Sequence, residues 1–137
     1  MWTLLILACA STPEASSPAA PDAAPVAPAA TGTRENTDLA GLEKALAAGA
    51  FVVDVRTDGE WQSGHVPGAK HLPLSDVRAD HPLFTEHGKD APIYVICESG
   101  GRSGRAADLL AGAGFHAVNV QGGTGAWRSA GKPLETP

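Results

Sequence analysis

The chain has 137 residues, with 15 Asp and Glu against 10 Lys and Arg, and it contains two cysteines. All ten basic residues lie from Arg34 onward and form no cluster, which argues against nucleic acid as a partner. Cys9 and Cys97 are too few for a disulfide framework, and the longest apolar run, residues 2–10, is too short to cross a bilayer as a helix. Residues 34–137 suffice for one small domain with a single core.

The first ten residues are apolar and include the tetrapeptide Ile6-Leu7-Ala8-Cys9. This stretch resembles the export signal of bacterial lipoproteins, in which a short apolar segment precedes a small residue and a cysteine that receives lipid. The resemblance implies a signal peptide over residues 1–8, lipid attachment at Cys9 as the protein's one link to a membrane, and a periplasmic, lipid-anchored protein of the cell envelope. Because the stretch has no Lys or Arg, an ordinary apolar N-terminus on a cytoplasmic protein is the alternative.

Residues 9–33 have the composition of a spacer. Nine Ala and five Pro lie between residues 10 and 31. Proline removes backbone donors and breaks helices, and few bulky apolar side chains remain to offset the entropy of an ordered chain. We therefore predict a disordered tether that leads to a folded domain over residues 34–137.

Helix and strand patterns alternate along that domain. Leucines at i, i+3 and i+7 predict a helix that starts near Leu39, with Thr37 or Asp38 as its cap and Gly49 as its end. The further expected elements are strands at residues 51–55, 69–72, 93–97 and 117–120, a broken helix within residues 74–84, and helices at residues 103–113 and 124–130. This order predicts an α/β domain with a mainly parallel central sheet flanked by helices, and a site at the carboxyl ends of its strands.

The most informative segment is Cys97-Glu98-Ser99-Gly100-Gly101-Arg102, which joins an expected strand to an expected helix. Two glycines let the backbone curl so that successive N–H groups point inward, and the helix start adds further N–H groups and its positive dipole end. A sulfur in such a nest is favoured as thiolate, the nucleophilic form, although Cys97 alone would also fit a small buried core residue. Arg102 is a cation where the helix dipole disfavours one, which indicates that it binds an anion.

Several motifs in order resemble the rhodanese family of sulfurtransferases. They are Asp54-Val55-Arg56, Glu60-Trp61, Gly64-His-Val-Pro-Gly-Ala69, His71-Leu72-Pro73, the loop from Cys97 to Arg102, Gly122-Gly123, Trp127 and Ala130-Gly-Lys-Pro133. The resemblance implies that Cys97 attacks the outer sulfur of a donor such as thiosulfate, becomes a persulfide, and passes the sulfur to a thiophilic acceptor such as cyanide or a thiol. It further implies a donor-binding role for Arg102, no metal or organic cofactor, and small molecules as partners of a monomer. The residues whose backbone N–H groups would cradle the sulfur are Glu98, Ser99, Gly100, Gly101, Arg102 and Ser103.

Charged residues near the loop are expected to shape the site. Arg56 and Glu60, four residues apart, predict a structural ion pair at its rim, and Asp54 is expected to bind loop backbone. The charge of Glu98 opposes an anionic donor. His65 is expected to be a packed structural residue, and His71, His81, His87 and His116 lack the spacing of metal ligands.

Two alternatives remain open from the residues alone. Phosphatases and arsenate reductases of related fold have five residues between cysteine and arginine; this chain has four, which makes a ring fitted to sulfur and cramped for phosphate. The other alternative is a persulfide carrier or redox-sensing module with little turnover.

Overall fold

The structure is a computed structural model that describes residues 32–137. The expected signal peptide, Cys9 and nearly all of the expected tether lie outside the described residues. No helix within residues 32–137 is long and apolar enough to cross a membrane.

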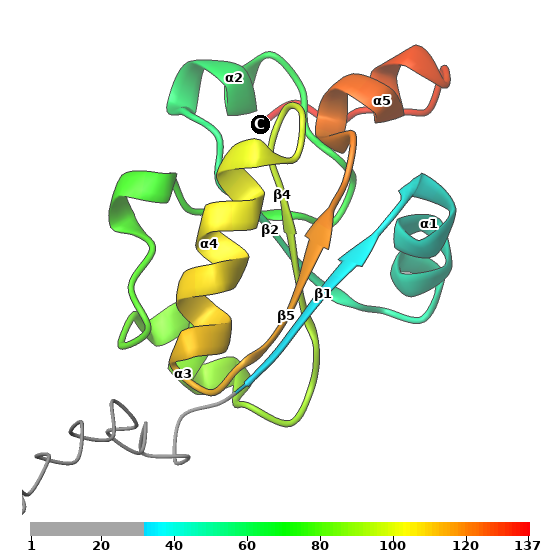
Figure 1. The fold of residues 1–137 in the computed structure, drawn as a ribbon. Coiled ribbons are helices and arrows are strands. Elements are labelled where there is room, and N and C mark those ends of the chain that lie inside the picture. Colours follow the sequence, from blue (N-terminus) through cyan, green and yellow to red (C-terminus); the bar gives the residue numbers. More distant parts are fainter. Residues whose placement is uncertain (1–31) are drawn as a thin grey trace, which may run out of the picture.

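Five parallel strands form one sheet in the order β1-β5-β4-β2-β3 (Figure 1). The strands are β1 (Thr33–Thr37), β2 (Phe51–Asp54), β3 (Lys70–His71), β4 (Ile93–Ile96) and β5 (His116–Val120). The helices are α1 (Leu39–Ala47), α2 (Asp58–Gln62), α3 (Pro82–His87), α4 (Gly101–Gly112) and α5 (Gly123–Ser129), with a 3₁₀ turn, η2, at Leu74–Asp76. The predicted α/β architecture with a parallel sheet is confirmed.

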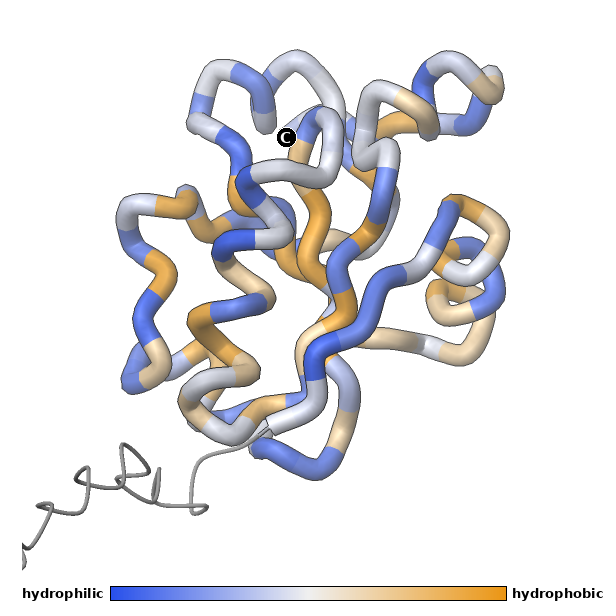
Figure 2. The backbone as a smooth tube through the Cα atoms, viewed as in Figure 1, coloured by the Kyte–Doolittle hydropathy of each residue, from blue (hydrophilic) through white to orange (hydrophobic). Residues whose placement is uncertain are grey.

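Helices cover both faces of the sheet. Side chains of α3 and α4, including Phe84 and Leu110, pack with Val53 and Val95 on one face. Side chains of α1 and α5 pack with Val52, Ile96 and Val120 on the other. Apolar residues therefore gather along the central strands, whereas polar residues are frequent in the connections (Figure 2). Burial on both faces explains why β2 and β4 have nearly continuous apolar sequences.

Local signals explain the first helix. The Asp38 side chain accepts a hydrogen bond from the Gly41 N–H at 2.9 Å, which satisfies one of the free donors of α1. After the helix, Gly49 adopts a φ of 78°, a left-handed conformation that glycine adopts without a steric penalty. The expected cap and stop of this helix are both present.

Two elements were not expected from the sequence. β1 is an edge strand that pairs only with β5 in the described sheet, and its sequence Thr-Arg-Glu-Asn-Thr lacks the apolar run of a central strand. α2 is only five residues long and is defined by its cap more than by an apolar face. The expected broken helix within residues 74–84 resolves into η2 and α3, with α3 extending to His87.

Candidate active site

Cys97 directly follows β4 and is fully buried among core side chains. The Gly100 N–H donates to its Sγ at 3.0 Å, and the Ser103 hydroxyl lies 3.4 Å from the same sulfur. Burial opposes ionisation of the thiol, but hydrogen bonds from the Ser103 hydroxyl and from the backbone of Ser103, Gly100 and Ser99 outweigh it, so the pKa of Cys97 is lowered from its ordinary value. A thiol in this environment has the properties of a reactive nucleophile.

Gly100 shows why the loop needs glycine at this position. It is the N-cap of α4 and adopts a φ of 104°, a left-handed conformation. This turn aims its N–H back at the sulfur while the chain enters the helix. The predicted curled loop is present, and contacts with the sulfur come from Ser99, Gly100 and Ser103 of the six residues expected to cradle it.

Backbone N–H groups at the beginning of α5 bind carbonyl groups of the loop that carries Cys97. The Thr124 N–H donates to the Cys97 carbonyl at 2.8 Å, and the Gly125 N–H donates to the Glu98 carbonyl at 2.9 Å. Gly123, with a φ of 54°, lies so close that a Cβ there would be 2.1 Å from the Cys97 carbonyl oxygen. These bonds satisfy the loop carbonyls on the side of α5. Sequence reasoning assigned no such role to this segment, although its Gly-Gly-Thr-Gly composition signals a close backbone approach.

Arg102, in the first turn of α4, is paired with a carboxylate of the chain itself, and its expected role in binding a donor stays a prediction. Its Nη1 and Nη2 each donate to the Glu60 carboxylate at 2.7 Å. The bonds to Arg102 lower the pKa of Glu60 to about 2 against the opposing effect of burial, with further bonds from Thr57. The same carboxylate raises the pKa of Arg102.

The expected ion pair between Arg56 and Glu60 is wrong. Glu60 is the third residue of α2, and its carboxylate turns back to accept from the Thr57 N–H and hydroxyl in a capping box. Arg56 instead turns inward and forms a buried pair with Asp54 at 2.7 Å. The Asp54 carboxylate also accepts from the Arg56 backbone N–H at 3.0 Å, in the connection that follows β2.

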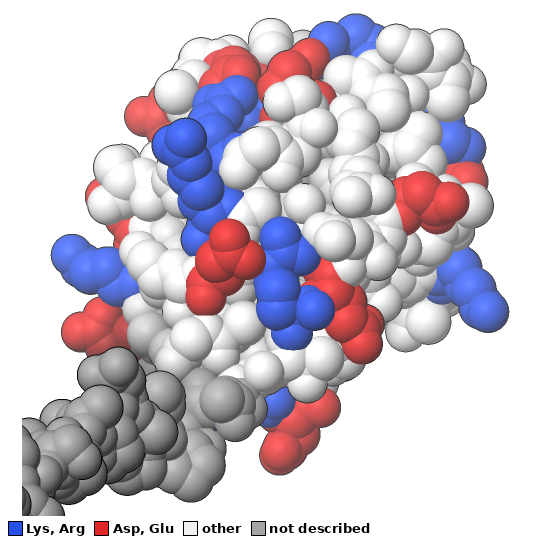
Figure 3. All heavy atoms as spheres, in the orientation of Figure 1, with Lys and Arg blue, Asp and Glu red and all other residues white. Residues whose placement is uncertain are grey.

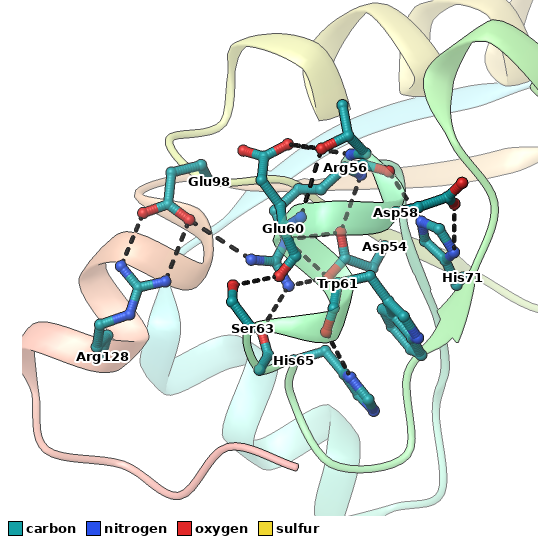
Figure 4. A network of polar contacts seen from close by, with 12 residues as sticks. Asp54, Arg56, Asp58, Glu60, Trp61, Ser63, His65, His71, Glu98 and Arg128 are labelled. Atoms are coloured by element: carbon teal, nitrogen blue, oxygen red, sulfur yellow. Dashed lines mark hydrogen bonds and ion pairs between the residues drawn. The ribbon is translucent and has the colours of Figure 1, made fainter. Parts of the chain in front are cut away.

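Arg56 also connects the segment after α2 to the loop that follows Cys97 (Figure 4). Its Nη2 donates to the Gly64 carbonyl at 2.8 Å, and its Nη1 lies 3.6 Å from the Glu98 carboxylate. Arg128 of α5 approaches the same carboxylate at 3.0 Å. The negative charge of Glu98 is thus held between two guanidinium groups next to Cys97.

The imidazole of His65 is packed rather than free. It stacks on Trp61 with ring centroids 3.4 Å apart, and its Nδ1 lies 3.3 Å from the Trp61 carbonyl oxygen. His71 lies on the same indole at 4.8 Å and contacts the Arg56 carbonyl at 2.9 Å. These rings buttress α2 and the turn that holds Arg56. Residues 32–137 contain no group of three His, Cys, Asp or Glu side chains placed to bind a metal.

The surface charge is mixed. On the face shown in Figure 3, acidic and basic side chains are interspersed, and neither sign forms a continuous patch. On this face, charge is therefore presented by individual side chains and not by an extended field of one sign.

Comparison with known proteins identifies the family. Residues 38–130 match the model of the Rhodanese-like domain, and the chain therefore belongs to this family. It is 42% identical over 96 residues to the thiosulfate sulfurtransferase GlpE of Pseudomonas putida, an alignment that covers 69% of this chain and 84% of that protein. It is also 42% identical over 82 residues to the protein of the same name from Ectopseudomonas mendocina, which covers 59% of this chain and 72% of the relative.

Solved structures give the same result. A rhodanese-related protein from Thermoplasma volcanium superimposes with a TM-score of 0.66 at 28% identity, covering 75% of this chain and 99% of that one. A rhodanese-like domain protein from Staphylococcus aureus superimposes with a TM-score of 0.63 at 32% identity, covering 75% and 98% respectively. Family and relatives together support a sulfurtransferase activity in general.

Proposed function

We propose that this protein is a sulfurtransferase that carries a sulfane sulfur on Cys97, taking it from an anionic donor such as thiosulfate and giving it to a thiophilic acceptor such as cyanide or a thiol. The observation that carries the proposal is the cradle of hydrogen-bond donors around the Cys97 sulfur, which lowers the pKa of the thiol. The same donors suit a negatively charged persulfide. The naming of relatives as thiosulfate sulfurtransferases agrees with this choice of donor.

The reaction has two displacement steps. The Cys97 thiolate attacks the outer sulfur of thiosulfate, an S–S bond forms, and the donor's S–S bond breaks with its electron pair leaving on sulfite. Cyanide then attacks the outer sulfur of the persulfide, thiocyanate leaves, and the thiolate is restored. Both forms of the sulfur are anionic, so the Gly100 N–H and the Ser103 hydroxyl can stabilise each without rearrangement of the backbone.

Arg102 is proposed to bind the anionic end of the donor. A guanidinium has five N–H donors, and Glu60 occupies one on each of its two Nη atoms. The remaining donors can bind a sulfonate at the rim of the loop while Glu60 fixes the orientation of the planar group.

The test uses the full chain in a thiosulfate–cyanide assay that measures thiocyanate. Cys97→Ser is expected to abolish turnover, and incubation of the wild type with thiosulfate is expected to add the mass of one sulfur to the peptide that holds Cys97. Arg102→Ala is expected mainly to raise KM for thiosulfate, because the reacting sulfur remains in place. Full activity of Cys97→Ser would overturn the mechanism, and Cys9→Ser is the matched control.

A persulfide carrier with little turnover is the second candidate, and Glu98 favours it. Its carboxylate pairs with Arg56 and Arg128 and so takes up positive charge that would otherwise attract a small anionic donor to the loop. A carrier would accept one labelled sulfur per chain and release it to a thiol without rapid thiocyanate formation. Single-turnover and steady-state measurements on the same preparation distinguish the two.

A further inference from the structure

A chain of polar groups runs from the buried catalytic sulfur to the exposed edge of the sheet. The hydroxyl of Ser103, fully buried on α4, donates to the Asn119 Oδ1 at 2.6 Å. Asn119 is 6% exposed on β5, and its Nδ2 donates to the Oδ1 of Asn36 on β1 at 3.3 Å. The two asparagines are direct register partners, and α4 lies over these two strands (Figure 1). None of the sequence motifs drew attention to this chain of contacts.

Arg34 fixes which atoms donate and which accept along this series of hydrogen bonds. A guanidinium can only donate hydrogen bonds, and the Arg34 Nη1 donates to the Asn36 Oδ1 at 2.7 Å. The oxygen of Asn36 therefore faces Asn119, which must present its NH₂ group there and its oxygen to Ser103. Arg34 is itself held by Asp108 of α4 at 2.7 Å. A partly exposed ion pair thus decides which end of a buried amide meets the Ser103 hydroxyl.

The Ser103 hydroxyl has one hydrogen and two acceptors. The Asn119 oxygen is 2.6 Å away and the Cys97 sulfur is 3.4 Å away. With the hydrogen on the shorter contact, a lone pair of the Ser103 oxygen faces the sulfur and can accept a hydrogen bond from the S–H of a neutral thiol. A thiolate or persulfide needs that hydrogen itself, so the hydroxyl must turn away from Asn119 to stabilise it.

We propose that Asn119 is a positioning residue for Cys97: its side-chain oxygen competes with the sulfur for the Ser103 hydroxyl and so sets the balance between the neutral and the anionic sulfur. The inference rests on the proposed role of Cys97 as the sulfur carrier. Asn119 acts through Ser103 and touches neither the sulfur nor a substrate in this arrangement. The amide oxygen of Asn119 is an acceptor of moderate strength. A carboxylate at this position would be a stronger acceptor, and a hydrocarbon side chain would offer none.

The charges around Cys97 are paired with one another and stay constant in this comparison. They come from the end of β2, from α2, from the loop, and from α4 and α5, and they are Asp54, Arg56, Glu60, Glu98, Arg102 and Arg128. On the side of Asn119, the charged groups are Arg34 and Asp108. Asn119→Leu leaves all of these side chains present and adds no charge, so its effect on the sulfur reports the hydroxyl.

The experiment measures the rate of Cys97 alkylation by iodoacetamide as a function of pH in the full chain with Cys9→Ser, which leaves one thiol. Asn119→Leu frees the hydroxyl for the sulfur, so the pH midpoint of alkylation is expected to fall. Below that midpoint a larger fraction of Cys97 is thiolate, but a more acidic thiolate is also a weaker nucleophile, so the rate is expected to rise only about threefold. Asn119→Asp strengthens the competing acceptor and adds a negative charge that itself opposes a thiolate, so it is expected to move the midpoint upward and to lower that rate. Adding Ser103→Ala is expected to erase the effect of Asn119→Leu.

A second pair of variants, at a residue outside the core, keeps the test decisive if the Asn119 variants fold poorly. Arg34→Met lets both amides reverse, so that Asn119 can donate to Ser103 and release its hydrogen to the sulfur; its profile is expected to resemble that of Asn119→Leu. Arg34→Lys keeps a donor-only group and is expected to keep the wild-type profile. An upward or absent shift for Asn119→Leu, or a shift of that variant that persists with Ser103→Ala, would overturn the proposal. Alkylation needs no sulfur donor, so this result is independent of whether thiosulfate is turned over.

Discussion

At the scale of single residues, the site depends on one close approach between backbones. Gly123 stands where a methyl group would overlap the carbonyl of the residue that carries the sulfur, at 2.1 Å. The neighbouring amide of Thr124 holds that carbonyl at 2.8 Å. The shape of the loop around Cys97 therefore depends on a residue far away in sequence that contributes no side chain.

Gly123→Ala is expected to displace the loop and to lower the rate of sulfur transfer by about 100-fold, the effect of moving a reacting group by about 1 Å. Gly131→Ala is the matched control. Both glycines have a positive φ, 54° and 69°, but a Cβ at Gly131 meets nothing within 4 Å. Each substitution carries a backbone cost of about 1 kcal/mol, measurable by denaturant unfolding. Equal activity in the two variants would contradict a special role for Gly123.

Residues also show the limits of sequence reasoning. Cys97 and its loop could be identified because the signal is local: a buried strand, two glycines, a cation and a helix start lie within a short segment. The partner of Glu60 could not, because Arg102 is 42 residues away and the closer candidate, Arg56, turns to Asp54. The contact between Ser103 and Asn119 likewise exists only once α4 lies on β5.

At the scale of elements, α2 and α4 are joined through the pair of Glu60 and Arg102. Glu60 caps its own helix and binds the first turn of α4 with the same carboxylate. This ties the orientation of the arginine at the loop to the N-terminus of a short helix. This connection is therefore expected to weaken when the Glu60 carboxyl group is protonated.

The pKa of Glu60 falls from 4.5 to about 2 on folding, so its contribution to stability is complete above about pH 4.5 and is lost as the pH falls through about 2. Because the side chain is 33% exposed, we expect roughly 1 kcal/mol after allowance for screening. Glu60→Gln keeps a capping side chain without the charge. The difference in free energy of unfolding between the two proteins should therefore shrink as the pH is lowered from about 5 to 2. A constant difference would show that the ion pair contributes no pH-dependent stability.

Most elements could be predicted because their patterns reflect burial. The central strands are apolar on both faces, and the leucines of α1 share one face that packs on the sheet. β1 escaped prediction because an edge strand with polar side chains has no such pattern, and its pairing with β5 is decided by the rest of the sheet. The short α2 carried a capping signal but too few residues for a period.

At the scale of the whole molecule, the expected lipid attachment of the N-terminal segment can be tested directly. We propose that Cys9, outside the described residues, carries a lipid. Wild type expressed in a bacterium is then expected to partition into detergent, whereas Cys9→Ala is expected to remain in the aqueous phase. Identical partitioning of the two proteins would remove the case for an anchor. Cys97→Ser serves as the control, since loss of that thiol leaves the anchor in place.

The common direction of the strands has a spatial consequence for such an anchored protein. β1 begins at Thr33, paired with the first residue of β5, whereas Cys97 follows the last residue of β4. Because the strands are parallel, the chain enters the domain at one end of the sheet and the sulfur lies at the other (Figure 1). The attachment point and the end of the sheet where an acceptor must reach Cys97 are therefore separated by the length of the strands.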